Sequence, residues 1–352
     1  MTDSSGQSGV IHTELPPVRA FPANVTFLDL IRSNKRKSTI LMIGMCLLLV
    51  TLGAAITAAL AVYFQGGDLP NLLPSVILGA IAAGLVGIVG AIWSFYGGSS
   101  AILSISGAKE VPPEADPQLH NVIEELALAA GIPKPRIFLI DDTALNAFAT
   151  GRDPEHAAVA ITIGLRQQLT RDELAGVMAH ELSHVRNYDT RFAMLMATMV
   201  GLIVFACDAF WRILYYSNWS AGGRGSRRGG SNSKSEGGNI IMVVILVVAI
   251  ILAIIAPLLA SLIRLAVSRQ REYLADAGAV ELTRYPQGLI SALQKLGADK
   301  EPLEVANRAT SHLYIVNPLK SAMKGDGHEM SSVFLTHPPL SDRIARLQAL
   351  IQ

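Results

Sequence analysis

The stretch VMAHELSHVRN, residues 177–187, places two histidines four positions apart, with a glutamate directly after the first. On a helix, residues four apart share one face with about 5 to 6 Å between their Cβ atoms, so His180 and His184 can reach one ion. Glu181 is then placed to contact a water on that ion. With 8 histidines in 352 residues, this HExxH pattern, in which x is any residue, would arise by chance about 0.007 times per chain. The stretch therefore predicts a zinc-binding helix.

A zinc ion that keeps one position open for water takes three protein ligands, so a third donor must come from elsewhere in the chain. The best candidate lies in SRQREYLADAGA, residues 268–279, where Glu272 and Asp276 are four apart on an expected helix. One carboxylate can bind the metal while the other accepts a hydrogen bond from a ligand histidine. An isolated pair of this spacing would predict only a solvated acidic face. Beside HExxH, we favour the metal-site interpretation.

The composition is that of a membrane protein. Hydrophobic residues make up 51% of the chain, charged residues only 16%, and the mean hydropathy is +0.39. A net charge of +1 without a basic module gives no reason to expect a nucleic-acid partner. Both cysteines lie in apolar runs, which argues against a disulfide framework and against a cysteine metal site.

Four stretches are apolar and long enough to cross a hydrocarbon core of about 30 Å, which needs roughly 20 helical residues. These expected spans are residues 39–64, 72–96, 193–215 and 240–263. The polar tail before the first span is too long for the basic start of a signal peptide, so we expect the span to be retained. The Gly/Ser-rich residues 218–239 predict a disordered connector.

Between the second and third spans, residues from about 100 to 192 have the pattern of a water-soluble domain. Asp116, followed by proline, is expected to begin a helix. Apolar runs predict strands at residues 137–140, 146–150 and 158–163. Thr170, with Glu173 three positions later, has the sequence pattern of a capping box and should begin the HExxH helix.

The metal-site hypothesis constrains the topology. If Glu272 binds the same ion as the two histidines, residues 187 and 268 lie on one side of the membrane, so an even number of spans must separate them; two are found. Four basic residues, Arg32, Lys35, Arg36 and Lys37, lie just before the first span, whereas the loop of residues 65–71 has none. We therefore expect a cytoplasmic site. The basic residues within 218–239 oppose this orientation, but the first span usually dominates.

These features resemble the HtpX family of membrane-bound zinc metalloproteases. The resemblance runs from about residue 40 to the C-terminus. It is carried by four motifs in order: NAFATG at 146–151, AHELSH at 179–184, SRQREYLADAGA at 268–279 and THPPLSDRI at 336–344. The chain departs from shorter members of that family in its polar tail and its Gly/Ser/Arg loop.

The resemblance implies an α+β membrane protein, mainly α, with four transmembrane helices and a zincin-like cytoplasmic catalytic domain that contains a small β-sheet. We expect five regions: a polar, disordered tail (1–38), a transmembrane hairpin (39–96), a first catalytic part (97–192), two spans joined by the disordered loop (193–263) and a second catalytic part (264–352). The location expected is the inner, cytoplasmic membrane.

The resemblance also implies the roles of the metal-site residues. His180 and His184 would bind one Zn²⁺ per subunit, Glu272 would be the third ligand and Glu181 the general base. Asp276 would lie behind the ligands and orient a histidine. Asp189 is expected only to cap or bridge at the helix end, with no catalytic role.

Further roles follow from the same resemblance. Asn146, Ala147, Phe148 and Ala149 would form the edge strand along which an extended substrate adds by main-chain hydrogen bonds. His337 is a candidate donor to the developing oxyanion, although a turn histidine before two prolines accounts for it equally well. Arg343 would hold that segment in place, and a structural ion pair is the preferred interpretation.

The leading hypothesis is an endopeptidase that cleaves damaged or misfolded membrane proteins in quality control and stress response. Its partners would be polypeptide substrates and the lipid bilayer. A CAAX-type prenyl-protein protease is a second possibility, although that class has more spans and an intramembrane chamber. A scaffold or transporter with a structural zinc is a third, but the spans are nearly free of ionisable residues.

Overall fold

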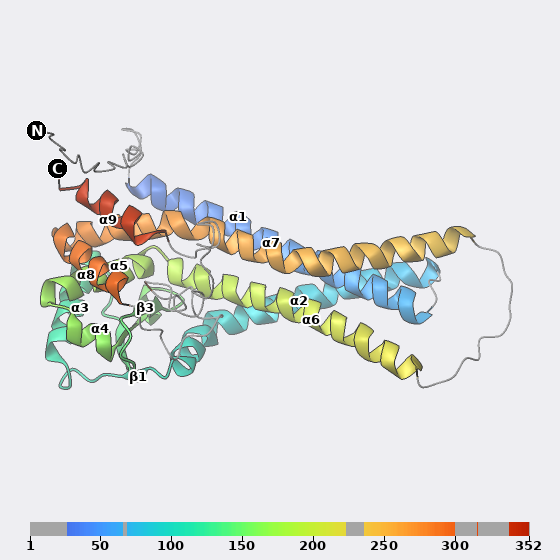
Figure 1. Ribbon diagram of the computed structural model, residues 1–352, viewed down its shortest axis with the longest axis horizontal. Coiled ribbons are helices and arrows are strands. Elements are labelled where there is room, and N and C mark those ends of the chain that lie inside the picture. Colours follow the sequence, from blue (N-terminus) through green and yellow to red (C-terminus); the bar gives the residue numbers. More distant parts are fainter. Residues whose placement is uncertain (1–26, 66–68, 223–235, 300–314, 316–337, 352) are drawn as a thin grey trace, which may run out of the picture.

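The fold is known from a computed structural model that describes residues 27–65, 69–222, 236–299, 315 and 338–351. Four long helices form an elongated bundle, and a mixed α/β domain lies at one end of it (Figure 1). The long helices are α1 (Phe27–Gln65), α2 (Leu69–Ile105), α6 (Asp189–Gly222) and α7 (Glu236–Thr283). The chain is therefore mainly helical, as the sequence predicts.

Three helices of the described part are long and apolar enough to cross a membrane. Their apolar segments are Thr39–Phe64, Leu72–Ile105 and Asp189–Tyr216. Large apolar side chains such as Leu78 and Phe205 point out of the bundle, where lipid rather than protein would cover them. The described apolar stretch of α7, Leu246–Leu259, is shorter. Three of the expected spans are therefore long apolar helices, and the fourth, over residues 240–263, stays a prediction.

Small residues let the first two helices of the bundle approach closely. A Cβ atom on Gly79 would lie 2.6 Å from the carbonyl oxygen of Gly53 and 1.9 Å from Thr57 Oγ1. No side chain larger than hydrogen fits there, which is the usual way that helices pack in lipid, where van der Waals contact replaces the hydrophobic effect. A core of residues such as Leu52, Ile203 and Phe210 joins α1 and α6, and α7 runs beside α1 (Figure 1).

The sheet of the α/β domain has four strands in the order β1-β2-β4-β3. They are β1 (Lys109–Glu110), β2 (Arg136–Ile140), β3 (Ala147–Thr150) and β4 (Ala158–Thr162). β2 and β4 are parallel, while β1 and β3 are antiparallel to their neighbours, with Ala147 opposite Ile161. Among the described residues β3 is thus an edge strand. The three longer strands are those expected from the sequence; the two-residue β1 is too short to give a pattern.

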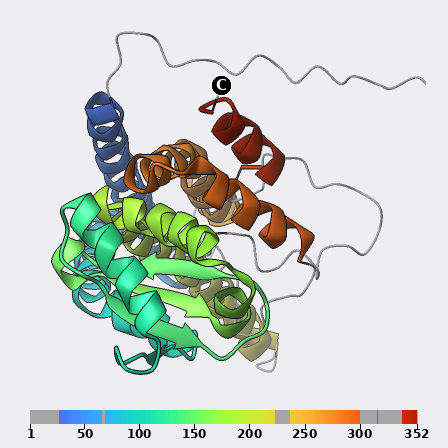
Figure 2. The ribbon, with the colours of Figure 1, turned by 90° about the vertical axis from the view of Figure 1, so that its left-hand side faces the viewer.

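Helices cover both faces of this sheet. The remaining helices of the domain are α3 (Pro117–Ala130), η1 (Pro154–His156), α4 (Ile163–Gln168), α5 (Arg171–Arg186), α8 (Pro286–Ala298) and α9 (Leu340–Gln348). α3 and α5 pack on one face (Figure 2), in a core that includes Ile123, Val159 and Val177. The other face packs on the end of α2, where Leu103 meets Phe138. This places the sheet between the HExxH helix and the bundle.

A capping box begins α5, as predicted. Thr170 Oγ1 accepts from the backbone N–H of Glu173, and Glu173 Oε2 accepts from the N–H of Thr170 at 2.8 Å. The same carboxylate accepts from Ser291 Oγ at 2.5 Å and from Lys295 Nζ at 2.7 Å, both on α8. One buried carboxylate therefore fixes the start of the HExxH helix and docks α8 against it.

This arrangement predicts a pH-dependent contribution of Glu173 to stability. Burial alone would raise the pKa of the Glu173 carboxyl, but the hydrogen bonds from Lys295, Ser291 and Thr170 outweigh it and lower the pKa from 4.5 to about 2. Because the folded pKa lies below the unfolded one, the stabilisation is present above pH 4.5 and is lost as the pH falls toward 2. We expect Glu173→Gln to cost about 1–3 kcal/mol at pH 7.

The measurement is thermal unfolding of the purified chain in detergent between pH 7 and pH 3. The difference between Glu173→Gln and wild type should shrink toward the acid end of this range. Glu125→Gln, which removes an exposed partner of Arg171 at the same end of α5, should differ little from wild type at any pH. A difference for Glu173→Gln that stays constant over the range would contradict the prediction.

Candidate metal centre

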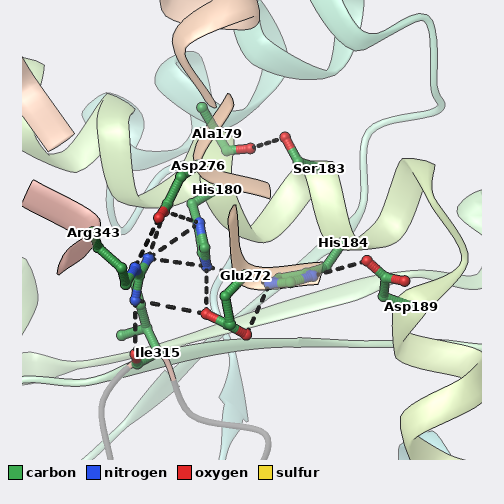
Figure 3. A network of polar contacts seen from close by, with 9 residues as sticks. All are labelled: Ala179, His180, Ser183, His184, Asp189, Glu272, Asp276, Ile315 and Arg343. Atoms are coloured by element: carbon green, nitrogen blue, oxygen red, sulfur yellow. Dashed lines mark hydrogen bonds and ion pairs between the residues drawn. The ribbon is translucent and has the colours of Figure 1, made fainter. Parts of the chain in front are cut away.

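Two helices from distant parts of the chain supply the expected ligands of the centre (Figure 3). α5 supplies His180 and His184, one turn apart, with Glu181 directly after the first histidine on the buried part of the helix. α7, which runs from the bundle into the domain without a break, supplies Glu272 and Asp276. All of these side chains except that of His184, which is partly exposed, are buried. The two helices pack directly against each other and bring the two sequence motifs together.

The spacing of the three expected ligands fits a tetrahedral metal ion. Nε2 of His180 lies 3.2 Å from Nε2 of His184. The carboxylate of Glu272 lies 3.6 Å from the first of these nitrogens and 3.7 Å from the second. Ligand atoms bound to zinc at about 2.0–2.1 Å in tetrahedral geometry are themselves about 3.3–3.4 Å apart. His180, His184 and Glu272 therefore form a site that fits zinc.

Carboxylates fix the orientation of both imidazoles. Nδ1 of His180 lies 3.0 Å from Asp276 Oδ1, and Nδ1 of His184 lies 3.1 Å from Asp189 Oδ2. Since a carboxylate only accepts, each Nδ1 is the protonated nitrogen, and each Nε2 presents a lone pair. Two lone pairs and the Glu272 carboxylate thus face one another in a largely buried space, which is unfavourable unless a cation lies among them.

The carboxylates around His180 also favour its protonated form. Burial and the Arg343 charge lower the pKa of His180, but hydrogen bonds with Asp276 and Glu272 outweigh them and raise the pKa to about 9. A proton and a zinc ion therefore compete for the same lone pair, and zinc binding must release protons. The donor set is chemically matched to a divalent ion of borderline softness.

Arg343 supports the centre from α9. It is fully buried and binds Asp276 through two hydrogen bonds, from Nε at 2.9 Å and from Nη2 at 2.6 Å. Its Nη1 lies 3.6 Å from Glu272 Oε2. Burial alone would raise the pKa of Asp276, but the charge of Arg343 and the hydrogen bond from His180 hold it below its ordinary value. Asp276 is therefore an anion that accepts from His180.

Glu181 lies between the metal ligands and the edge of the sheet. Its side chain is buried, and burial raises the pKa of its carboxyl despite the nearby histidines. The backbone N–H of Ala149 donates to this carboxylate. A carboxyl group with a raised pKa takes up a proton more readily, which suits a general base.

The residues predicted to bind substrate lie on and before the edge strand β3. Asn146 is buried, and its Oδ1 accepts from the N–H of Ala147 at 3.1 Å. The side chain of Phe148 is buried between the sheet and α2, so this residue can contribute only its backbone at the edge. The carbonyl of Ala147 accepts from the N–H of Ile315 at 3.0 Å. One backbone acceptor of the edge is thus occupied by the chain itself.

Two contacts were missed by reasoning from sequence. Asp189 was expected only to cap or bridge, yet it accepts from His184. Ile315 donates to Ala147, and its carbonyl accepts from Arg343 Nη1 at 3.4 Å. No periodic pattern could have indicated either contact, although an acidic residue just beyond the HExxH helix was a weak signal for the first. His337, the candidate oxyanion donor, lies outside the described residues.

A second group of possible ligands is less suited to a metal. Asp153, Glu155 and His156 lie close together at the surface. However, Asp153 contacts Nδ1 of His156 at 2.6 Å, and Arg152 contacts Nε2 at 2.5 Å. Both ring nitrogens are engaged within one turn, so we assign no metal to this group.

Comparison with known proteins agrees with this geometry. Residues 113–351 match the model of peptidase family M48. The chain is 42% identical over 325 residues to the protease HtpX homolog of Dictyoglomus turgidum, covering 92% of this chain and 95% of the relative. It is also 42% identical over 322 residues to that of Ligilactobacillus salivarius, covering 90% and 98%. The crystal structure of S. mikatae Ste24p is similar with a TM-score of 0.46 and 20% identity, covering 91% of this chain and 67% of that one.

The buried position of Arg343 predicts that its removal weakens both the fold and the metal centre. In Arg343→Met the Asp276 carboxylate loses its cation, and we expect a loss of about 3–5 kcal/mol in stability. Because Asp276 then orients His180 less well, zinc affinity should fall about 10–100-fold. Thermal unfolding and a zinc titration against a competing chelator measure the two effects.

Arg346→Met is the matched control, because Arg346 lies on the same helix and stacks over the ring of Tyr273 outside the centre. It should leave zinc affinity unchanged. Equal zinc affinities for Arg343→Met and wild type would mean that Arg343 does not act on the centre.

Proposed function

The chain belongs to peptidase family M48 as a membrane metalloprotease of the HtpX type, and on that premise we propose that it hydrolyses peptide bonds of misfolded or damaged membrane proteins. The observation that carries the chemistry is the convergence of His180, His184 and Glu272, with Glu181 beside them. Membership of a peptidase family removes the reason to consider a scaffold or transporter with a structural zinc.

In this proposal each residue of the centre has one task. His180, His184 and Glu272 would hold the zinc, which when bound lowers the pKa of a water molecule and polarises the peptide carbonyl. Glu181 accepts the proton of the attacking water at its carboxylate, and later gives it to the leaving amine. Its burial supports this role, because the raised pKa brings the carboxyl closer to the pH at which it must both accept and release a proton.

The substrate would add to the outer edge of β3. Ala147 and Ala149 are two apart, so their backbone groups point the same way, out of the sheet. The contacts to Ile315 and Glu181 mark that direction. An extended peptide there would pass beside Glu181, and its N–H would replace that of Ile315 on the Ala147 carbonyl. Asn146 lies next to this acceptor and would hold the peptide backbone.

The position of the centre supports a membrane-protein substrate. Glu272 lies on α7, in a direct helical continuation of the bundle, and α6 begins three residues after α5 ends. A polypeptide that emerges from the bilayer would therefore meet the centre within a short distance of the membrane. Folded soluble proteins would have no such guided approach.

We further propose that the centre faces the cytoplasm. Lys37, at the basic start of α1, donates to Gln270 at 3.1 Å, two residues before Glu272. The basic residues that precede the first span are thus on the same side of the bundle as the centre. By the positive-inside tendency that side is cytoplasmic.

Replacement of the general base provides the main functional test. Glu181→Gln keeps the size of the side chain but cannot accept the proton, so we expect normal zinc content and a loss of cleavage of about 10²–10⁴-fold. Metal analysis and cleavage of an unfolded polypeptide, with and without chelator, measure the two properties. Glu124→Gln, an exposed change on α3, should behave as wild type. Full activity in Glu181→Gln would exclude it as the base, and a strict need for a prenylated C-terminus would favour the CAAX-type alternative.

The orientation is tested by cysteine labelling in intact cells, in a chain whose Cys46 and Cys207 are replaced by alanine. We expect Glu114→Cys, on the exposed surface of the α/β domain, to react with a membrane-impermeant thiol reagent only after the cells are permeabilised. Ser231→Cys, in the Gly/Ser-rich segment, should react in intact cells. The reverse pattern would place the centre outside the cytoplasm.

A further inference from the structure

Asp189 repeats, for the second histidine, the arrangement that Asp276 makes for the first. Its Oδ2 lies 3.1 Å from Nδ1 of His184, close to the 3.0 Å between Asp276 and Nδ1 of His180. Figure 3 shows the two carboxylates on opposite sides of the histidine pair. Asp189 lies on α6 and Asp276 on α7, so the two imidazoles are held by different helices.

Each of the two aspartates also has an arginine. Asp276 is bound by Arg343, and Asp189 Oδ1 lies 3.5 Å from Nη1 of Arg271. The guanidinium carbon of Arg271 lies 3.8 Å from the ring centroid of Phe192, and its side chain is only 7% exposed. Arg271 is therefore held by the aromatic ring and the carboxylate together. Arg271 directly precedes the expected ligand Glu272. One short segment of α7 therefore contains residues that support both histidines.

The backbone between α5 and α6 is strained at the point that brings Asp189 to His184. Tyr188 has φ 62, a left-handed conformation that favours glycine. Such a conformation is unfavourable for a residue with a side chain and persists only where the surroundings demand it. The left-handed conformation of Tyr188 lets α6 begin at Asp189, three residues after the end of α5. The Asp189 carboxylate is thereby directed toward His184.

A purely structural role for Asp189 would require fewer contacts than the structure has. An acidic residue in the first turn of α6 stabilises that helix by its interaction with the helix dipole. That effect needs only a negative charge near the helix start. It does not require contact with His184, nor a buried arginine on the opposite oxygen.

We infer that Asp189 is a positioning residue for the second zinc ligand, and that Arg271 acts through Asp189 by fixing its carboxylate. The inference rests on the proposed role of His184 in binding zinc. Asp189 holds the proton on Nδ1 of His184 and keeps Nε2 directed at the ion. Since Asp189 begins one apolar helix of the bundle and Arg271 lies on the extension of another, packing of α6 against α7 sets the geometry of this ligand.

The experiment measures zinc affinity of the full chain purified in detergent, stripped of metal and titrated against a competing chelator. Asp189→Leu keeps the size but cannot accept a hydrogen bond, and we expect a 10–100-fold loss of affinity and an altered visible spectrum of the Co²⁺-substituted protein. Asp189→Asn keeps an acceptor oxygen and should lose less. Glu281→Gln removes an ion pair between α7 and Arg186 of α5 that lies away from the centre, and should match wild type.

Arg271→Gln separates positioning from a local effect on helix stability. It should weaken zinc binding less than Asp189→Leu does, and the double variant should be no worse than Asp189→Leu alone, because the arginine acts through the aspartate. Additive losses of zinc affinity in the double variant would mean that Arg271 does not act through Asp189. Wild-type affinity and an unchanged Co²⁺ spectrum in Asp189→Leu would overturn the inference.

If Asp189→Leu fails to fold, Arg271→Gln decides the matter, and wild-type zinc affinity in that variant then overturns the inference. Failure of the wild-type chain itself to bind zinc would instead contradict the proposed function. The two failures are therefore distinguishable in one set of titrations.

Discussion

The structure depends on an electrostatic constraint at the crossing of α5 and α7. Two imidazole lone pairs, 3.2 Å apart, and one carboxylate face each other where little water can separate them. Such a cluster is unfavourable in the absence of a cation, and its spacing matches the edge of a zinc tetrahedron. The carboxylates that contact both Nδ1 atoms keep the two Nε2 atoms directed at this space. The spacing of the ligand atoms and the orientation of the rings therefore fit a zinc ion.

The support of this cluster comes from the membrane bundle as much as from the α/β domain. Asp276 and Arg271 lie on the extension of α7, while Asp189 is the first residue of α6. Arginines pair with both orienting aspartates, so each of these buried carboxylates has a positive partner. The expected boundaries at residues 192/193 and 263/264 fall inside α6 and α7, which continue without interruption. The helices of the bundle therefore also carry residues of the metal centre.

In the proposed function, the edge strand β3 would bind a polypeptide through its backbone rather than through its side chains. Backbone groups of Ala147 and Ala149 point toward the centre, and main-chain hydrogen bonds are indifferent to side-chain identity. Under the proposal, such recognition would suit substrates that are unfolded rather than substrates with a particular sequence motif. The N–H of Ile315 donates to the Ala147 carbonyl at this edge.

The sequence by itself determined those features that arise from short-range periodicity and local chemistry. The i, i+4 spacing of His180 and His184, the Thr170 capping box, the apolar spans and the strand that follows Asn146 are all patterns within one element. Tertiary structure alone decided which elements meet: that Asp189 turns back onto His184, that Arg271 and Phe192 stack behind it, and that Ile315 lies on β3. These contacts join residues whose separation along the chain carries no periodic signal, because packing and not backbone geometry brings them together.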